Sequence, residues 1–244
     1  MTAAILSVGT THPWNIAGVG RDWSVSRDHG VACFTVIAAV SAQDDRTLAA
    51  VEALSPVMVR AQLESVPWER IGAVRVGALG SAENVRVTAE AIVRHAAIVA
   101  VVDPVVRTSG GEALDVEETL PVVAASLATL PNVILTPNLD EAAALLGVER
   151  LQEDELVSAA ERLRARGVAA VLLKGGHLPG APRDVLADGT GTHVFTDERI
   201  PVRMRGTGCA LAAALACSLA RSVPLPEAVR AARSYVRSLL EARR

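Results

Sequence analysis

The chain of 244 residues is poor in aromatic residues, cysteine and lysine. Aromatic residues make up 2% of the sequence whereas 50% is hydrophobic, so the predicted core consists mostly of Ala, Val and Leu. The three cysteines, a small and odd number, provide no disulfide framework and indicate a reducing compartment. Lys174 is the only lysine in a chain that otherwise uses arginine, which makes this position notable.

These absences also argue against several classes of function. The net charge is −3, and acidic and basic residues are mixed along the chain without the basic face typical of nucleic-acid-binding proteins. The first residues, "MTAAILSVG", contain no basic segment, and their apolar run is too short for a signal peptide. No run reaches the roughly 20 apolar residues that a membrane helix needs. We therefore expect a soluble cytoplasmic protein.

Short apolar runs of strand length alternate with segments of helical character. Continuous apolar runs are typical of strands buried on both faces, and here they cover 3–9, 31–40, 73–79, 97–106, 132–138 and 169–176. Helix start and stop residues predict helices over 81–95, 138–147 and 152–166, with a short antiparallel excursion over 184–202. The alternation predicts a single α/β domain over 1–244, built on a parallel sheet with helices on both faces. Ligands of such sheets bind at the carboxyl ends of the strands.

The segment "RMRGTGCALAAALA" (203–216) places two glycines and a cysteine directly before an alanine-rich helix. The glycines allow a tight turn whose N–H groups can approach a ligand closely. A helix start adds unpaired N–H groups and the positive end of the helix dipole, so the turn can bind an anion. A thiol there, at Cys209, is expected to have a lowered pKa. An ordinary helix start with a small buried cysteine fits this short pattern equally well.

Two further motifs follow predicted strands. "TPNLDEA" (136–142) places Asn138 and Glu141 three residues apart at a helix start, where the Glu can reach Mg²⁺, often through water. The same spacing fits a capping box, which we favour on spacing alone. "LLKGGH" (172–177) places Lys174 before two glycines, where it can neutralise phosphate charge. The alternative is a solvated lysine in a turn.

Together and in this order, the motifs resemble the ribokinase-like superfamily, and within it the hydroxymethylpyrimidine/phosphomethylpyrimidine kinases of thiamine biosynthesis. Further similarities are "VSAQDDR" (40–46), "VMVRAQLESV" (57–66) and "VVDPVV" with "TSGGEAL" (101–114), and the resemblance extends over about residues 4–220. It implies a three-layer α/β/α sandwich with a mainly parallel central sheet, ATP and Mg²⁺ as cofactors, and a small pyrimidine substrate. The family often forms homodimers, which extends to this chain by analogy.

The resemblance also implies roles for individual residues. The family transfers the γ-phosphoryl group of ATP to a primary alcohol and then to the phosphate of the product. The implied catalytic residues are Gly206, Thr207, Gly208 and Cys209. They form an anion hole, and Cys209 also acts as the base. The implied metal-binding residue is Glu141, and the implied cofactor-binding residues are Lys174, Asn138 and Asp103. The implied substrate-binding residues are Gln43, Gly9, Ala17, Asp22 and Ala78.

Departures from the family pattern gather near the substrate. The first loop, "VGTTHPWNIAG" (8–18), is one residue longer than usual and has Asn-Ile in place of Gly-Gly. Trp14 in this loop can stack on a flat ring or fill space, and we favour packing. Ala78 replaces a usual Met, which would widen the pocket, and Arg205 replaces a usual His before the glycine turn.

Three hypotheses for function follow from the sequence. The leading one is an ATP-dependent kinase of 4-amino-5-hydroxymethyl-2-methylpyrimidine, its monophosphate or both. The second is a kinase of the same fold for another heteroaromatic alcohol such as pyridoxal, which the altered first loop and Ala78 motivate. The third is a non-catalytic pyrimidine-binding protein. The lost Gly-Gly pair favours this last hypothesis, whereas the intact phosphate motifs weigh against it.

Overall fold

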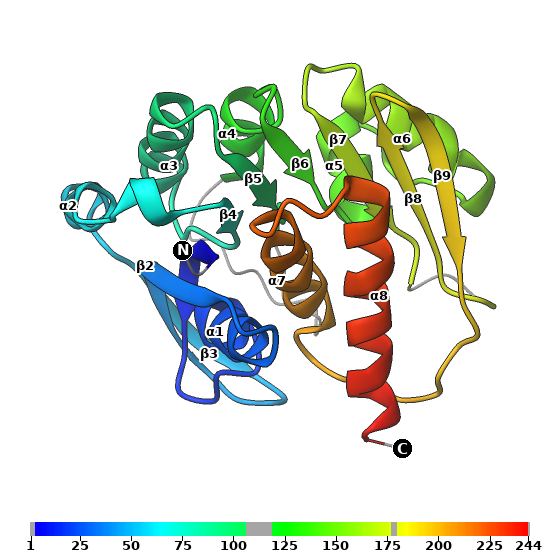
Figure 1. Cartoon of the computed structure of the whole chain (residues 1–244), viewed down its shortest axis with the longest axis horizontal. Helices are drawn as coiled ribbons and strands as arrows, with labels where there is room; N and C mark the ends of the chain where they lie inside the picture. The colour runs from blue at the N-terminus through cyan, green and yellow to red at the C-terminus, as the bar shows by residue number, and fades with distance from the viewer. Residues whose placement is uncertain (1–2, 106–118, 177–179, 244) are drawn as a thin grey trace.

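The computed structural model describes residues 3–105, 119–176 and 180–243. In this part of the chain, nine strands form one continuous sheet in the order β3-β2-β1-β4-β5-β6-β7-β8-β9. The strands are β1 (Ala4–Thr11), β2 (Ala32–Gln43), β3 (Leu48–Ala53), β4 (Ala73–Val76), β5 (Val99–Val102), β6 (Val133–Leu135), β7 (Ala170–Lys174), β8 (Arg183–Asp188) and β9 (Gly191–Thr196). The sheet is parallel from β2 to β7, and antiparallel strands β3 at one edge and β8–β9 at the other complete it (Figure 1).

The predicted pattern of strands is confirmed. Strands β1, β2 and β4–β7 fall on the six apolar runs, and every residue of β4 and β6 is buried. Continuous burial follows from cover on both faces of a parallel sheet. The antiparallel excursion expected over 184–202 is the β8–β9 hairpin. The segment 108–114 and His177 of the recognised motifs lie outside the described residues.

Helices pack against both faces of this sheet (Figure 1). They are α1 (Gly18–Asp28), α2 (Pro56–Glu64), α3 (Ala82–Arg94), α4 (Thr119–Ser126), α5 (Leu139–Leu146), α6 (Leu156–Arg164), α7 (Thr207–Leu219) and α8 (Leu225–Glu241). One core cluster joins the sheet to helices α2 to α6, and a second joins its other face to α1, α7 and α8. The predicted helices correspond to α3, to α5, and to α6 with the short 3-10 turn before it.

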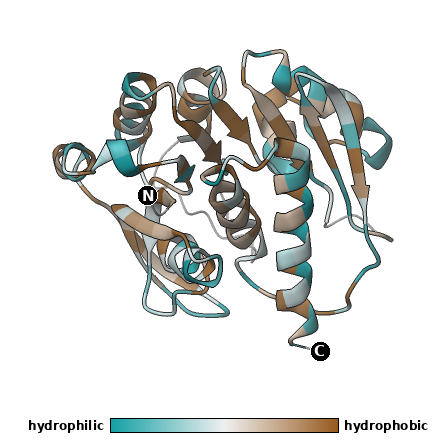
Figure 2. Cartoon of the chain, viewed as in Figure 1, coloured by the Kyte–Doolittle hydropathy of each residue, from teal (hydrophilic) through white to brown (hydrophobic). Residues whose placement is uncertain are grey.

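Helix α7 is the most deeply buried helix of the second cluster, and its sequence explains its place. From Ala210 to Ser218 every residue is buried, and most of them are alanines. A helix that is apolar all round needs cover on all sides, which here comes from α1, α8, β4 and β5. Figure 2 shows the helix as uniformly hydrophobic, in contrast to the two-faced α8. The expected core of small aliphatic residues is thus confirmed.

Several elements, among them α1, α2, α4 and β3, were not predicted from the sequence. Helix α1 has no acidic residue in its first turn and no side-chain cap, so it lacks start signals. Helix α2 exposes Val57 and Met58, which weakens its amphipathic pattern. Strand β3 is a short edge strand of small residues. Within the described ranges, no helix is both long enough and apolar enough to cross a bilayer.

Candidate active site

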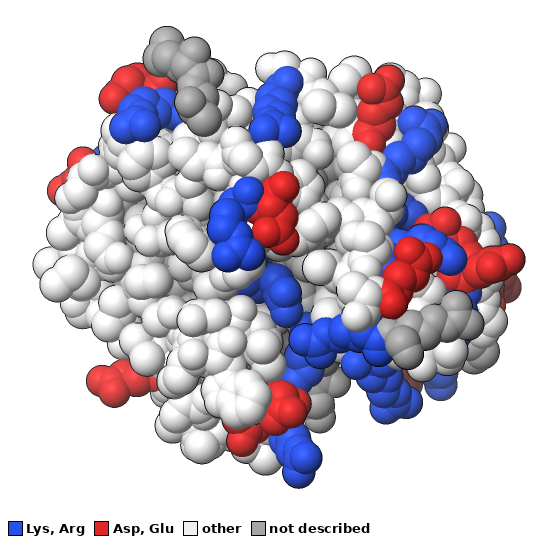
Figure 3. All heavy atoms as spheres, turned by 60° about the horizontal axis from the view of Figure 1, so that its bottom comes forward, with Lys and Arg blue, Asp and Glu red and all other residues white. Residues whose placement is uncertain are grey.

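The predicted site residues lie at the carboxyl ends of the parallel strands. Asp103 directly follows β5, Lys174 ends β7, and the 206–209 turn begins α7. Figure 3 looks toward this edge of the molecule and shows a band of Lys and Arg side chains that runs outward from its centre. Such a band favours an anionic ligand at this edge.

The glycine turn lies close to Ile16 of the first loop on one side and to Lys174 and Asp103 on the other. Gly206 has a φ of +78°, and a Cβ at this position would lie 1.9 Å from the carbonyl oxygen of Ile16. A Cβ at Gly208 would lie 3.4 Å from Lys174 Nζ and 3.8 Å from Asp103 Oδ2. Because no side chain caps this start of α7, its first N–H groups are available to an anion beside the lysine. The structure thus brings together the turn, Lys174 and Asp103.

Lys174 is held by carboxylates and is not a solvated turn residue, so that alternative is wrong. Its Nζ lies 2.7 Å from Asp103 Oδ1, and its side chain is 14% exposed. Burial lowers the pKa of Lys174, but the carboxylates of Asp103 and Glu141 outweigh burial and raise it above its ordinary value. Thr136 Oγ1 also donates to Asp103 Oδ1, at 3.3 Å. Lys174 therefore keeps its positive charge at neutral pH, beside the carboxylate of Asp103.

The favoured interpretation of Asn138 and Glu141 as a capping box is confirmed. Asn138 Oδ1 accepts from the Glu141 N–H at 2.9 Å, and Glu141 Oε2 accepts from the Asn138 N–H at 2.8 Å. An isolated bridge pairs Asn138 with Lys174, so the start of α5 adjoins the end of β7. Burial raises the pKa of Glu141 to about 7, against the opposing charge of Lys174. This carboxylate therefore needs further positive charge to ionise fully.

A buried carboxylate that lacks sufficient positive charge is a suitable partner for Mg²⁺. Among the described residues, no three His, Cys, Asp or Glu side chains are grouped to hold a metal ion by themselves. A magnesium ion near Glu141 would therefore complete its shell with water and phosphate oxygens, as this ion commonly does. The residues present fit the group.

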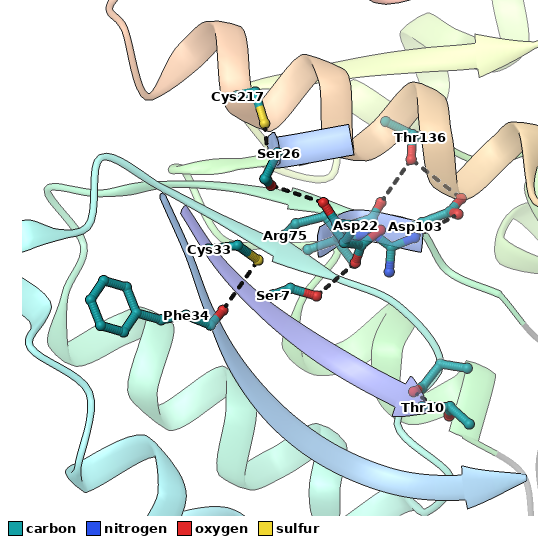
Figure 4. A network of polar contacts seen from close by, with 12 residues as sticks. Ser7, Thr10, Asp22, Ser26, Cys33, Phe34, Arg75, Asp103, Thr136 and Cys217 are labelled. Atoms are coloured by element: carbon teal, nitrogen blue, oxygen red, sulfur yellow. Dashed lines mark hydrogen bonds and ion pairs between the residues drawn. The ribbon is translucent and has the colours of Figure 1, made fainter. Parts of the chain in front are cut away.

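Arg75 is a site residue that the sequence analysis missed. It lies in β4 and is 1% exposed, with Nε 3.3 Å from Asp22 Oδ2 and Nη2 3.6 Å from Asp103 Oδ2. Figure 4 shows its side chain between the two carboxylates. The sequence did contain an indication, because "AVRVGAL" has a charge inside a run that is buried on both faces. Such a charge requires a paired partner.

Asp22 was expected beside the substrate ring, and the structure contradicts this. Its side chain is 0% exposed, on the inner face of α1. Ser7 Oγ donates to Asp22 Oδ2 at 2.6 Å, and Arg75 lies against the same oxygen. Burial raises the pKa of Asp22 to about 6, although Arg75 and Ser7 lower it. The carboxylate is thus paired with Ser7 and Arg75 beneath the site, where a ligand cannot contact it in this conformation.

The expectation of a lowered pKa for Cys209 is also wrong. Burial raises the pKa of this thiol above its ordinary value, and the Arg75 guanidinium provides the largest opposing effect. The carboxylates of Asp103 and Asp22 raise the pKa of the thiol further. The helix start alone does not offset the loss of water around the sulfur.

The remaining substrate-side residues lie around the ends of β1 and β2. A Cβ at Gly9 would lie 3.7 Å from the Ala78 carbonyl oxygen, which itself accepts from Thr10 Oγ1 at 2.9 Å. Gln43 is half-buried at the end of β2. Arg205 Nη1 donates to the Asp44 carbonyl at 3.0 Å and so connects the glycine turn to this strand end.

The altered first loop is ordered by its own contacts. His12 is 4% exposed, and its Nε2 accepts from the Ala17 N–H at 3.2 Å. Asn15 keeps a left-handed φ of +52°, a conformation that Asn tolerates better than most residues. Trp14 is 55% exposed, so the favoured interpretation that it fills space is wrong. Its ring is available at the surface of the loop.

Comparisons with known proteins agree with this geometry. The family model described as phosphomethylpyrimidine kinase matches residues 14–244. The chain is 39% identical to a hydroxymethylpyrimidine/phosphomethylpyrimidine kinase of Streptomyces coelicolor, over 98% of this chain and 88% of that protein. It is 36% identical to the protein of the same name from Rhizobium meliloti, over 99% of this chain and 92% of that protein.

Solved structures show the same architecture. A phosphomethylpyrimidine kinase from Clostridium difficile 630 superposes with a TM-score of 0.86 at 27% identity, covering 98% of this chain and 100% of that chain. The pyridoxal kinase from Staphylococcus aureus in complex with pyridoxal gives a TM-score of 0.88 at 25% identity, covering 99% of this chain and 88% of that chain. Both are similar to this chain along almost its whole length.

Proposed function

The chain belongs to the phosphomethylpyrimidine kinase family, and from this premise we propose that it phosphorylates 4-amino-5-hydroxymethyl-2-methylpyrimidine, its monophosphate or both, with ATP as the donor. As a member of this family it is a phosphotransferase. The main support for this proposal is that the glycine turn, Lys174 and Asp103 lie together at the carboxyl edge of the sheet. The strand ends with Gln43 and Ala78 lie beside them. We also propose the three-layer ribokinase-like arrangement for the whole domain. Formation of a homodimer stays a prediction.

In the proposed reaction, the alcohol of the pyrimidine attacks the γ-phosphorus of ATP in line with the leaving oxygen. A new P–O bond forms, the bond to the β-phosphate oxygen breaks, and ADP leaves with the bonding electrons. In its thiolate form, Cys209 accepts the hydroxyl proton as the attack proceeds. The backbone N–H groups of Gly206, Thr207 and Gly208 stabilise charge on the transferred group, as does Lys174.

The other proposed roles concern binding. Glu141 would hold Mg²⁺ through water, and when bound the ion would neutralise charge on the ATP phosphates. Gln43 would hydrogen-bond the edge of the pyrimidine, with Gly9, Ala17 and Ala78 as small residues beside the ring. Asp22 takes no part in ring contact here, because its carboxylate is buried beneath the site.

Pyridoxal is the alternative substrate, and two observations favour it. The structural similarity to the Staphylococcus aureus pyridoxal kinase is as extensive as that to the pyrimidine kinase. Ala78 also presents a smaller side chain than Met at a half-buried position beside β1.

The test is ATP consumption by the pure protein with hydroxymethylpyrimidine, its monophosphate and pyridoxal, each supplied separately with Mg²⁺. Turnover with either pyrimidine supports the proposal and shows which phosphorylation occurs. Turnover with pyridoxal alone supports the alternative. Pyrimidine binding without ATP consumption on any of the three would favour a non-catalytic binding protein.

A further inference from the structure

The turn after β7 is held by hydrogen bonds to both neighbouring parts of the sheet. Lys174 is the last residue of β7, and its own N–H donates to the Pro137 carbonyl at 2.8 Å, on the side of β6. The next N–H, that of the buried Gly175, donates to Asp184 Oδ1 at 2.9 Å, on the side of β8. The second of these bonds is unusual, because a side-chain carboxylate takes the place of a strand carbonyl.

Asp184 is a carboxylate in a nearly closed environment. It lies in β8, where it is in register with Lys174 of β7 on one side and with Phe195 of β9 on the other, and it is 7% exposed. A neutral carbonyl would satisfy a backbone N–H, whereas a buried carboxylate is costly unless it is paired. The partners of Asp184 therefore indicate why a charge is kept at this position.

The positive partner of Asp184 comes from the C-terminal helix α8 (Figure 1). Arg233 pairs with Asp184 Oδ2 through Nη1, and its side chain is 9% exposed. Its Nη2 lies 2.6 Å from Asp197 Oδ2, and its guanidinium carbon lies 5.8 Å from the centre of the Phe195 ring. The planar fork of an arginine binds two carboxylates at once in a fixed geometry. Asp184 is thus anchored to α8 by one oxygen and holds Gly175 with the other.

Lys174 is the side chain whose direction depends on this turn. Its Nζ lies 2.7 Å from Asp103 Oδ1, and a Cβ at Gly208 in the first turn of α7 would lie 3.4 Å from the same Nζ. A lysine is a point charge on a flexible four-carbon stem, so the place of its ammonium group depends on how firmly its backbone is held. Because a carboxylate is a stronger acceptor than a neutral carbonyl, Asp184 holds the turn more firmly than ordinary strand pairing would.

We propose that Asp184, held by Arg233, is a positioning residue for the phosphate side of the site: it fixes the turn after β7 and so the direction in which Lys174 points toward the nucleotide. This inference rests on the proposed role of Lys174 in binding phosphate. Asp184 acts through the N–H of Gly175. Without the carboxylate, this buried N–H would lose its partner, and the turn would shift toward water and move Lys174 with it.

The only lysine of the chain permits a direct test, because an amine-reactive reagent acetylates Lys174 and otherwise only the α-amino group. Acetylation of Lys174 by sulfo-NHS-acetate at pH 8 is followed by peptide mass spectrometry in Asp184→Ala and Asp184→Asn. We expect a rate about tenfold higher in Asp184→Ala, as for loss of a hydrogen bond to a charged group. Asp184→Asn should show a smaller increase, since an amide oxygen can still accept from the Gly175 N–H.

The second measurement is the affinity for AMP-PCP with Mg²⁺, determined by calorimetry on protein that has not been acetylated. It should be about tenfold weaker in Asp184→Ala, because a small misplacement of a binding group is costly. Asp197→Ala is the matched control, since it removes the other carboxylate that pairs with Arg233, at a side chain that is 45% exposed. It should change the rate and the affinity by less than about twofold.

Cys217 reports on the fold as a whole. It is 0% exposed, so its alkylation by iodoacetamide should stay slow in every folded variant. A merely structural role for Asp184 would speed the modification of Lys174 and Cys217 together and leave the affinity of the folded protein for AMP-PCP unchanged. If Asp184→Ala does not fold, Asp184→Asn keeps the size of the side chain and decides the question against Asp197→Ala.

An unchanged rate at Lys174 in the folded Asp184 variants, or an equal increase in Asp197→Ala, would overturn the proposal. The acetylation rate needs neither nucleotide nor substrate. Absence of nucleotide binding or of turnover by the unmodified protein would therefore count against the proposed function alone, whereas the rate at Lys174 decides the role of Asp184.

Discussion

The side chains at the carboxyl edge differ in the step that each would affect, and Cys209, as the proposed base, would affect the chemical step alone. Cys209→Ala should lower kcat by roughly 10²–10⁴-fold, the usual range for loss of an acid–base group, while the affinity for an ATP analogue stays near that of the unmodified protein. The measurements are steady-state kinetics with the accepted substrate and titration with AMP-PCP. Cys33→Ala is the matched control, since that thiol lies away from the turn, and it should retain activity. Equal turnover in the two variants would rule out Cys209 as the base.

The raised pKa of Glu141 predicts how the stability of the fold depends on pH. Burial raises its pKa from 4.5 to about 7, so between these values the folded protein binds more protons than the unfolded chain. The free energy of unfolding therefore falls as pH rises through this window. Without ligands, Glu141→Gln should show a smaller fall in Tm between pH 5 and 8 and a Tm a few degrees higher at pH 8.

Asp22, with a pKa raised to about 6, adds a similar slope that Glu141→Gln leaves in place. The matched control is Glu155→Gln, which alters a second capping box, where Glu155 Oε2 accepts from the Gln152 N–H at 2.7 Å near the surface. It should follow the unmodified protein at every pH. Thermal unfolding with the same pH slope in all three proteins would contradict a raised pKa at Glu141.

Residue identity alone predicted some of these roles and not others. The capping box follows from local spacing, so Asn138 and Glu141 could be paired from the sequence. The environment of Cys209 could not, because its pKa depends on burial and on Arg75, which lies far away in the chain. Asp22 was misplaced for the same reason. A resemblance can assign a residue to a site, but not the direction in which its side chain points.

At the scale of elements, the first loop and the glycine turn depend on each other. Gly206→Ala would force a Cβ to within 1.9 Å of the Ile16 carbonyl oxygen at a φ of +78°. We expect a loss of about 1–3 kcal/mol in the free energy of unfolding, measured by denaturant titration, and a fall in kcat/KM. Gly189→Ala is the control, since a Cβ there would have Arg164 Nη2 at 4.0 Å as its nearest neighbour, and it should change stability by less than about 0.5 kcal/mol. Similar losses in both variants would show that the contact with the loop is unimportant.

The elements that could be predicted are those whose apolar pattern or helix start and stop residues match the burial seen in the structure. Strands β4 and β6 are apolar throughout and are covered on both faces, and α5 has both a cap and a terminal glycine. Helix α1 lacks those signals, and its register is set by tertiary contacts with α7 and β1. Arg75 in β4 is an exception, because a charged side chain does not fit the apolar pattern that predicts a buried strand. Such local exceptions are expected at functional sites.

At the scale of the whole molecule, the order of the strands explains why one arginine reaches both halves of the site. Strand β4 lies between β1, which leads to the substrate loop, and β5, which leads to Asp103. Lys174 and the start of α7 lie beside Asp103, on the proposed phosphate side of this boundary. Bound ligands on either side therefore act on one connected set of buried charges, and their binding should be visible in the stability of the entire fold.

Nucleotide binding should stabilise the molecule by mass action. AMP-PCP with Mg²⁺ at 100 times its Kd should add about 2.7 kcal/mol, which corresponds to a rise in Tm of roughly 5–10 °C for a chain of this size. Lys174→Met should remove most of this rise, because it removes the buried charge beside Asp103 that we propose to face the phosphates. Arg27→Met, which also removes one positive charge but at an exposed position of α1, should retain it. An equal rise in the two variants would place the nucleotide elsewhere, and a protein that binds only pyrimidines would show no rise at all.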